Sequence, residues 1–435
     1  SRIKEWSRED AILELLRGRI SILGPVTAAE LAQSLRIDES DAEFALLKLE
    51  GEGVILRGAF SAQKQWCERR LLARIHRYTL NRLRAEIEPV GAADFMRFLF
   101  AWQHVAPSSR LMGVDGLQNV LAQLDGFEVA ASAWERAVLP ARITGYDASL
   151  LDTLCLSGEI GWARLSAAET NVVSVTPIAL FLREHADIWQ AMRPESGDIA
   201  LSDSAQRVLE ELRERGASFA RDLGEDEDVH RALAELVSAG LVSSDGYAGL
   251  RALIAASARD KQRAGRWSLL GRNDIDEDDA IETQARVFLR RYGIVFRRLL
   301  GREPNAAPWR ELARVYRRLE ARGEIRGGRF VHGMSGEQFA LPEAIERMRE
   351  IRREQHDDAI VVISAADPLN LTGILTTDER IRAIAGTRIA YRNGVAVSVL
   401  EGEYLRPLTE STPEIAAMLA GRRVPVSSGW VGRTA

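Results

Sequence analysis

Lysine and cysteine are scarce in this chain, which has four lysines and two cysteines among 435 residues. The lysines are Lys4, Lys48, Lys64 and Lys261. None of them precedes Ser or Thr, as the lysine of a P-loop does, so we expect no P-loop nucleotide hydrolase within this chain. Cys67 and Cys155 form neither a CxxC pair nor a metal-ligand spacing, which argues against a disulfide framework.

Other absences bear on the cellular compartment and on the kinds of catalytic or metal site expected in this chain. No apolar run approaches the roughly 20 residues that span a bilayer, and nothing at the N-terminus resembles a signal peptide. The six histidines are scattered singly, without HxxxH or HExxH spacing, and no GxSxG nucleophile motif occurs. We therefore expect a cytoplasmic, reduced protein with no membrane segment, no metal site and no cofactor in this chain. Because the chain starts at Ser1 without Met, we also expect a piece of a longer protein.

Charge is distributed unevenly along the chain. The formal net charge is −5, so this is not a uniformly basic nucleic-acid binder. Residues 261–329 nevertheless hold 17 lysines and arginines against 10 aspartates and glutamates. A confined basic face on an acidic body can still follow the phosphates of a nucleic acid.

The basic segment contains the pattern of a winged helix. One face of the expected helix 308–322 carries apolar residues at i, i+3, i+4 and i+7, namely Leu312, Val315, Tyr316 and Leu319. The opposite face carries Arg310, Arg314, Arg317 and Arg318. A Gly-rich hairpin with Arg326 and Arg329 follows. A helix followed by a basic hairpin predicts a recognition helix and its wing, with these six arginines facing DNA.

Two further stretches, 8–60 and 201–255, also read as winged helices, but their third helices are acidic. The first carries Asp41, Glu43 and Glu50, and the second begins with a run of acids at 225–228. Such faces repel phosphate, so we interpret both domains as structural or protein-binding. Their acidic faces could be subunit interfaces.

A long basic helix is expected at 64–90, where Arg70, Arg74 and Arg77 share one face. One interpretation is a nucleic-acid-facing helix on which His76 or Tyr78 stacks against a base. The other is a solvated face paired with neighbouring acids. The sequence favours neither.

The expected fold class is mainly α with small β elements: tandem winged helices, a helical aromatic-rich segment and a C-terminal β-barrel-like domain. In the aromatic-rich segment, Phe95, Phe98, Leu99 and Trp102 are expected in the core. Strand periodicity and an Asn393-Gly394 turn mark 357–407 as a small barrel or sheet. The expected parts are winged helices at 1–62, 201–255 and 279–345, a helical domain with the basic helix at 63–200, a linker at 256–278, and the barrel-like domain with its tail at 346–435.

Three strings, at 71–90, 151–165 and 327–349, closely resemble the C-terminal region of Lhr, the bacterial large helicase-related proteins. The resemblance covers most of the chain. It implies a 3′-to-5′ ATP-dependent DNA helicase of DNA repair, whose motor, with its ATP and magnesium, lies upstream of this region. It also implies tandem winged helices plus a β-barrel, a partner in the helicase core of the same polypeptide, and assembly into a homo-oligomer.

That arrangement is similar to AlkZ, a bacterial DNA glycosylase, which implies base excision as an alternative. The AlkZ-like family uses a Gln-apolar-Gln pair, and the nearest string here, Gln63-Lys64-Gln65, has lysine at its centre. Base excision also requires a carboxylate near the sugar, for which Asp94, Asp115 and Asp147 are the candidates by neighbourhood. The competing interpretation is that Asp94 caps a helix and that the other two lie in turns.

Three functional hypotheses follow. The leading one is an accessory region of a repair helicase that binds single-stranded or tailed DNA. The second is a glycosylase that removes uracil or a damaged base. The third is a transcription regulator, against which stand the two acidic recognition faces and the lack of an effector domain. The sequence leaves open the oligomeric state, strand polarity, lesion preference and whether the barrel touches DNA.

Overall fold

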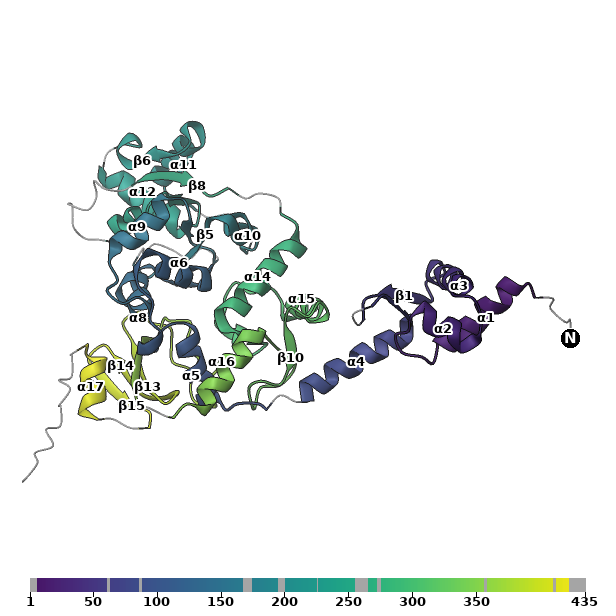
Figure 1. Cartoon of the computed structure of the whole chain (residues 1–435). Coiled ribbons are helices and arrows are strands. Elements are labelled where there is room, and N and C mark those ends of the chain that lie inside the picture. The colour runs from purple at the N-terminus through teal and green to yellow at the C-terminus, as the bar shows by residue number, and fades with distance from the viewer. Residues whose placement is uncertain are drawn as a thin grey trace, which may run out of the picture. The chain divides into compact units, whose positions relative to one another are not determined.

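The structure is a computed structural model that is mostly helical, with small antiparallel sheets (Figure 1). It describes residues 6–60, 63–85, 88–166, 174–194, 200–224, 226–254, 265–271, 275–355, 358–409 and 412–421. The chain divides into two compact units, Ser1–Ile87 and Glu88–Ala435. None of the helices in the described part of the chain has the length and apolar character needed to cross a membrane.

The first unit is a winged helix followed by a long helix. Its elements are α1 (Arg8–Ile20), α2 (Ala28–Leu35), α3 (Glu39–Gly51), β1 (Ile55–Gly58), β2 (Gln65–Glu68) and α4 (Arg69–Ala85). Thr27 and Glu30 form a capping box that starts α2, because each side chain accepts the other residue's backbone N–H. The basic helix was predicted to start at residue 64, but 65–68 form the second wing strand, paired with β1, and the helix begins at Arg69.

A winged helix that the sequence did not reveal opens the second unit, where a purely helical segment was expected. Its elements are α5 (Ala92–Trp102), η1 (Pro107–Ser109), α6 (Gly113–Gln123), β3 (Glu128–Ala130), α7 (Ala131–Ala133), η2 (Trp134–Val138), α8 (Leu139–Arg142), α9 (Ala148–Leu156), β4 (Ile160–Ala163), β5 (Pro177–Leu182), η3 (Arg183–His185) and α10 (Ala186–Ala191). The strands pair in the order β3-β5-β4. Their residues are buried on both faces, so no alternation of polar and apolar residues marks them as strands.

The next winged helix differs from the prediction in its wing. It comprises α11 (Asp203–Arg215), β6 (Ser218–Phe219), η4 (Ala220–Asp222), α12 (Asp226–Ser238), β7 (Val242–Ser244), α13 (Tyr247–Ile254) and β8 (Arg266–Leu269). The end of this stretch, residues 241–254, was expected to form the wing strands, but it contains helix α13. Strand β8 lies inside the expected linker 256–278 and is the middle strand of the sheet β6-β8-β7.

The basic winged helix has the predicted pattern. It contains α14 (Glu277–Tyr292), β9 (Ile294–Phe296), η6 (Leu299–Arg302), α15 (Trp309–Ala321), β10 (Arg326–Gly328) and β11 (Gln338–Ala340), and α16 (Pro342–Arg353) follows. The sheet order is β10-β11-β9. All four apolar positions expected to face the core from α15 are buried, with Leu312, Tyr316 and Leu319 fully so.

The C-terminal region is an open sheet, and the expectation of a barrel was wrong for the described residues. Strands β12 (Ile360–Ser364), β13 (Arg388–Arg392), β14 (Val395–Glu401) and β15 (Tyr404–Pro407) pair antiparallel in chain order. The edge strands β12 and β15 do not pair with each other, since four short strands are too few to close a barrel. Helix α17 (Pro413–Leu419) packs on the sheet instead. The predicted turn is confirmed, because Asn393 and Gly394 have φ values of 51° and 80°.

Buried ion pairs fix the parts of the second unit to one another. The fully buried Arg142 forms a two-pronged bond with Asp367, at 2.6 and 2.9 Å, and also donates to Gln103 Oε1 at 2.9 Å. Gln103 Nε2 in turn donates to the carbonyl of Arg291 at 2.9 Å. Both ends of the buried Gln103 amide are therefore hydrogen-bonded, and this network joins four positions of the chain, at residues 103, 142, 291 and 367.

Candidate nucleic-acid interface

The arginines of α15 are exposed, but most of them already have carboxylate partners. Arg314 pairs with Glu311 at 2.9 Å, Arg318 pairs with Glu282 at 2.7 Å, and Arg317 donates to both carboxylate oxygens of Glu337. The basic face that helical periodicity predicted for α15 is thus partly neutralised by these glutamates. The cause is that two of the partners, Glu282 and Glu337, lie outside the helix.

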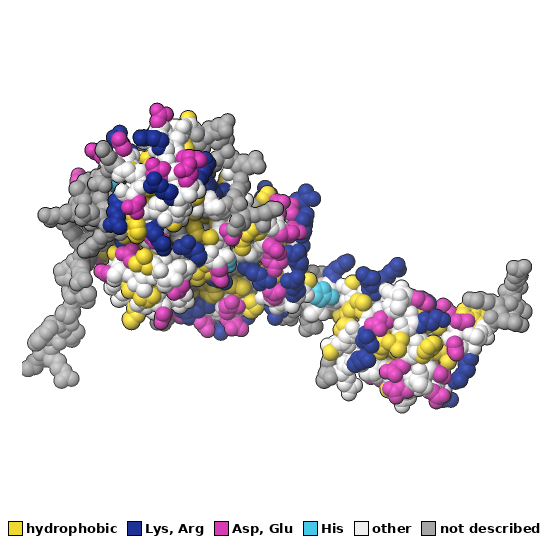
Figure 2. All heavy atoms as spheres, turned by 90° about the horizontal axis from the view of Figure 1, so that it is seen from above, with side chains coloured by type: hydrophobic (Ala, Val, Ile, Leu, Met, Phe, Trp, Pro, Cys, Tyr) yellow, Lys and Arg dark blue, Asp and Glu magenta, His cyan; other side chains and the backbone are white. Residues whose placement is uncertain are grey.

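Glu282 of α14 is the centre of this network. It accepts from Arg286 at 2.9 Å and lies 3.7 Å from Arg322, in addition to its bond with Arg318. The hydrogen bond from Arg286, followed by the charges of Arg286 and Arg318, holds the pKa of Glu282 below its usual value. Figure 2 shows acidic and basic side chains intermixed over much of the visible face. Exposed pairs of this kind contribute only about 0–1 kcal/mol each, so a phosphate can compete for these arginines.

Of the six arginines predicted to face DNA, three have no carboxylate partner among the described residues: Arg310 at the start of α15, and Arg326 and Arg329 of the wing. All three are exposed. They are therefore free to bind phosphate without first breaking an ion pair, and the wing is the less neutralised part of the predicted interface.

The wing has a fixed conformation because one buried side chain holds it. Gln338, which is 1% exposed, accepts the backbone N–H groups of Phe330 and Val331 at 2.9 and 2.8 Å and donates to the carbonyl of Val331 at 3.0 Å. On its other side, Val331 forms a parallel bridge with Val90. Arg329 thus projects from a backbone whose next two residues are anchored, which pre-organises it for a ligand.

Helix α4 is a second basic surface, with different surroundings. Arg70, Arg74 and Arg77 are exposed and have no ion-pair partner in the part of the chain that the structure describes. The helix contains no aspartate or glutamate between Arg69 and Ala85. Tyr78, on the same helix, is 69% exposed. Of the two interpretations that the sequence left open, pairing with neighbouring acids finds no support for these three arginines.

The third helices of the other winged helices offer no such cation cluster. On α3, the exposed residues include Phe44 and Leu47, at 59% and 50% exposure. On α12, the exposed Arg231 is paired with Asp228 at 2.6 Å. The interpretation of their winged helices as structural or protein-binding stays a prediction.

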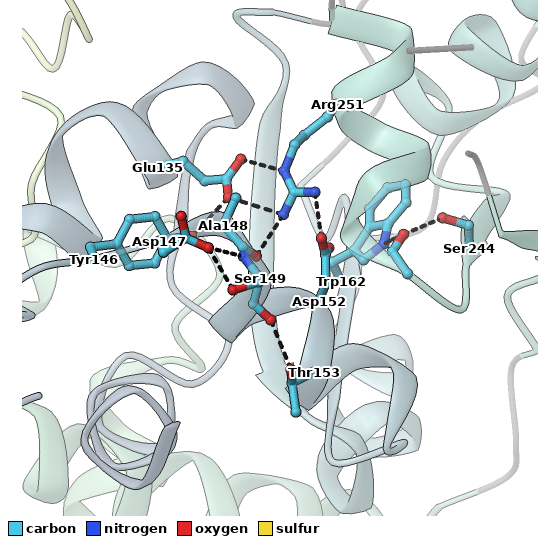
Figure 3. Close-up of polar contacts among 11 residues, drawn as sticks. Glu135, Tyr146, Asp147, Ala148, Ser149, Asp152, Thr153, Trp162, Ser244 and Arg251 are labelled. Carbon is cyan, nitrogen blue, oxygen red and sulfur yellow. Dashed lines mark hydrogen bonds and ion pairs between the residues drawn. The ribbon is translucent and has the colours of Figure 1, made fainter. Parts of the chain in front are cut away.

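Helix α9 is held by a contact that the sequence analysis missed (Figure 3). Arg251 of α13 donates to Glu135 at 2.7 Å, to Asp152 at 2.9 Å and to the carbonyl of Ala148 at 3.2 Å. The Tyr146 hydroxyl donates to Glu135 at 2.7 Å, and burial and the charge of Glu135 raise the pKa of Tyr146. This cluster fixes α9 to α13, while Ser149, Thr153 and Leu156 of the same helix remain exposed.

The three carboxylates considered for catalysis lie at the starts of separate helices. Asp147 caps α9, accepting the backbone N–H of Ser149 at 2.9 Å, and its bonds from the side chain and backbone of Ser149 lower its pKa. Asp94 pairs with Arg97 at 3.3 Å in the first turn of α5, whose N-cap is Gly91, so Asp94 does not cap the helix as expected. Asp115 is exposed in the first turn of α6. No recorded contact joins any two of them.

The glutamine string considered for base excision lies in the first winged helix. Gln63 and Lys64 precede β2, and Gln65 begins that strand, opposite Gly58 of β1. Gln63 and Lys64 are exposed. The string therefore belongs to a wing and not to a pocket described by the structure.

A cleft of about 1000 Å³ opens between α5, α6, α14 and α16. Its walls include Trp102, Gln123, Arg290 and Glu346. Phe95, Phe98 and Leu99 are fully buried as expected, but Trp102 is half-buried and forms part of the wall. Its spacing of four from Phe98 places it on the same helix face, so periodicity alone could not separate a core residue from a wall residue.

No group of three or more histidine, cysteine, aspartate or glutamate side chains with the geometry to hold a metal ion occurs among the residues described.

Comparison with known proteins identifies two segments of the second unit. Residues 90–183 match the family model of the third winged-helix domain of the large helicase-related protein, and residues 274–360 match that of the fourth. The chain is 30% identical over 409 residues to the "Lhr helicase/ probable uracil glycosylase" of Mycolicibacterium smegmatis, which covers 84% of this chain. It is 28% identical over 444 residues, 88% of this chain, to the "Lhr helicase/uracil glycosylase" of Escherichia coli.

The chain spans 27% and 28% of the lengths of these two relatives. The unexpected winged helix in the second unit is thus the domain matched as the third, and the basic one is the domain matched as the fourth. This chain therefore carries Lhr winged-helix domains and is a distant relative of the Lhr helicase/uracil glycosylase proteins.

Proposed function

We propose that this chain is an accessory, DNA-binding region of an Lhr-type DNA-repair helicase, without the ATPase motor. The observation that carries the proposal is the set of exposed, unpaired arginines on the fourth winged helix and on α4. Arg310, Arg326 and Arg329 stand where a winged helix contacts a phosphate backbone. Binding needs no nucleotide or metal cofactor in this region, because the arginines themselves supply the charge.

We further propose single-stranded or tailed DNA as the ligand. Helix α4 combines unpaired arginines with the exposed ring of Tyr78, and proteins that bind single strands combine cations along the backbone with aromatic rings for the bases. Because this recognition needs no base-specific contact, we expect little sequence preference.

Fluorescence anisotropy with a labelled single-stranded oligonucleotide tests the proposal. The logarithm of the association constant falls with the logarithm of the salt concentration by about 0.7 for each phosphate contact on a single strand. Contacts from all six unpaired arginines would give a slope of about −4. Affinity that does not change between 50 and 200 mM salt would contradict binding through these arginines.

Base excision is a second candidate, supported by the printed names of both relatives, which include uracil glycosylase. The purified chain would be incubated without ATP with an oligonucleotide carrying one uracil, then treated with alkali. Cleavage at the uracil, absent from a thymine control, would make this region an enzyme and direct mutagenesis to Asp94, Asp115 and Asp147. DNA that is bound but not cleaved would leave uracil excision unsupported and favour the accessory DNA-binding role.

We also propose that the upstream helicase core of the same polypeptide and further copies of the chain are its protein partners. The chain's small share of its relatives' length and the acidic α12 and mixed acidic-apolar α3 faces support this. A monomeric mass by light scattering would argue against self-assembly.

A further inference from the structure

The cleft lies between the two domains matched as the third and fourth Lhr winged helices. Helices α5 and α6 form one side, and α14 and α16 form the other. Its volume of about 1000 Å³ is at the upper end of the range for small-molecule sites, which often lie at domain boundaries. Beneath it, the buried Gln103 and Arg291 tie the two domains together, so both walls are held in place.

An aromatic ring of fixed orientation stands in the wall. The indole N–H of Trp102 donates to the carbonyl of Arg290 at 2.9 Å. Its ring packs on Phe98, with the two centroids 5.4 Å apart. Gly293, with a φ of 67°, lies so close that an added Cβ would be 2.8 Å from Phe98 and 3.2 Å from Trp102. A half-buried indole that cannot rotate offers a ready surface for a stacked base.

A buried acceptor without a partner lies beside this ring. Gln123 is 7% exposed, and its Nε2 donates to the carbonyl of Trp102 at 2.8 Å. Its Oε1 has no hydrogen-bond donor among the described residues. Burying an unpaired carbonyl costs free energy, so such a group in a cleft wall calls for a ligand that donates an N–H.

The two sides of the cleft differ in charge. Arg290, on the α14 side, is exposed and has no carboxylate partner in the described structure. Glu343 and Glu346, on the α16 side, are exposed acceptors. This separation suits a nucleotide. Its anionic phosphate would lie near the arginine, and the N–H groups of its base would donate to the carboxylates. Glu324 and Ile325, which directly precede the wing strand, also line the cleft, so it borders the proposed DNA surface.

We propose that this cleft receives one extruded nucleotide of the bound DNA. The base stacks on Trp102, its N–H groups face Gln123 and the glutamates, and its phosphate lies near Arg290. This inference rests on the proposed DNA binding and adds a second site to it, because the winged-helix arginines contact only the backbone. Extrusion costs least where a base is mispaired, so the site would favour a mismatched position over a paired one.

Photo-crosslinking tests the site directly. The probe is a duplex with a single mispaired 5-iodouracil, irradiated with the whole chain at a concentration that binds it fully, and the crosslinked peptide is identified by mass spectrometry. We expect the crosslink at Trp102, with a yield about tenfold higher than for the same duplex with the iodouracil paired. A crosslink that maps outside the cleft, or no crosslink with bound DNA, would overturn the inference and leave the proposed DNA binding intact. Absence of binding would overturn both.

A matched pair of variants separates the cleft from general charge effects. Arg290→Ala removes the only arginine of the cleft that lacks a carboxylate partner in the described structure, whereas Arg213→Ala removes an exposed arginine of α11, outside the cleft, that pairs with Glu210. At full occupancy, Arg290→Ala should lower the Trp102 crosslink yield about fivefold, and Arg213→Ala should not change it. Equal yields in both variants would show that Arg290 does not position the nucleotide and would contradict the proposed orientation.

Discussion

Helices α15 and α4 are both rich in arginine, but their arginines lie in different electrostatic surroundings. On α15, Arg314, Arg317 and Arg318 have glutamate partners, two of which come from other elements. On α4, no acidic residue lies between positions 69 and 85, and Arg70, Arg74 and Arg77 have no ion-pair partner among the described residues. The number of arginines on a helix face therefore does not by itself predict the electrostatic potential of that face. Whether the arginines are paired with carboxylates decides how much charge is available for DNA.

The largest effect on DNA binding is expected on α4. Replacing Arg70, Arg74 and Arg77 together by Ala should lower the affinity for a single strand about tenfold and make the salt slope shallower by about 2, because three unpaired charges are lost. Anisotropy titrations from 50 to 200 mM salt measure both. The matched control replaces Arg213, Arg215 and Arg221, three exposed arginines of the winged helix at 203–269, and should leave the slope unchanged.

A smaller loss is expected at the wing. Replacing Arg310, Arg326 and Arg329 by Ala removes the same formal charge as the α4 variant, but Glu311 and Glu324 lie close by in the sequence and weaken the local field. We expect about a fivefold loss of affinity with a slope change of about 2. An unchanged salt slope in the same titration would show that these three arginines do not contact DNA, and the comparison of the α15 region with α4 would then fail.

The pairing on α15 should also appear in the pH dependence of stability. The pKa of Glu282 is lowered in the folded state, so its contribution is present above its unfolded pKa and is lost as the pH falls through the folded value. Glu282→Gln should therefore reduce the free energy of unfolding by about 1 kcal/mol at pH 7. The difference from the unaltered chain should shrink below about pH 4.5 in urea unfolding. A difference independent of pH would mean that the ion pairs are not its source.

The smallest effect is expected for the paired arginines. Replacing Arg314 and Arg317 by Ala should weaken DNA binding only about twofold and flatten the salt slope by less than 1, since both charges are already compensated by Glu311 and Glu337. The same anisotropy series provides the measurement. A loss of DNA affinity equal to that of the wing variant would show that DNA displaces the glutamate partners without a free-energy cost. Ion pairing would then have no effect on DNA binding.

Local patterns in the sequence were sufficient for helices that carry one apolar face. The buried face of α15 was predicted correctly, because it depends only on the spacing of apolar residues along one helix. The turn at Asn393-Gly394 was also predicted correctly. The third Lhr winged helix was missed, because its strands are short and buried and resemble core helix segments.

The site depended on contacts between distant residues, which periodicity does not report. Glu282 and Glu337 neutralise α15 from other elements, and Arg251 reaches α9 from about 100 positions along the chain. Trp102 could not be distinguished from its fully buried neighbours on α5. The prediction of a barrel was wrong because a strand pattern shows that a sheet exists but not whether its edge strands pair with each other.

Arginine footprinting with phenylglyoxal and mass spectrometry, with and without a single-stranded oligonucleotide, tests the central claim most directly. DNA should protect Arg310, Arg326 and Arg329 of the fourth winged helix and Arg70, Arg74 and Arg77 of α4. Arg213, Arg215 and Arg221 should stay reactive under the same conditions. Protection of this second set without protection of the first would contradict the assignment of DNA binding to the unpaired arginines.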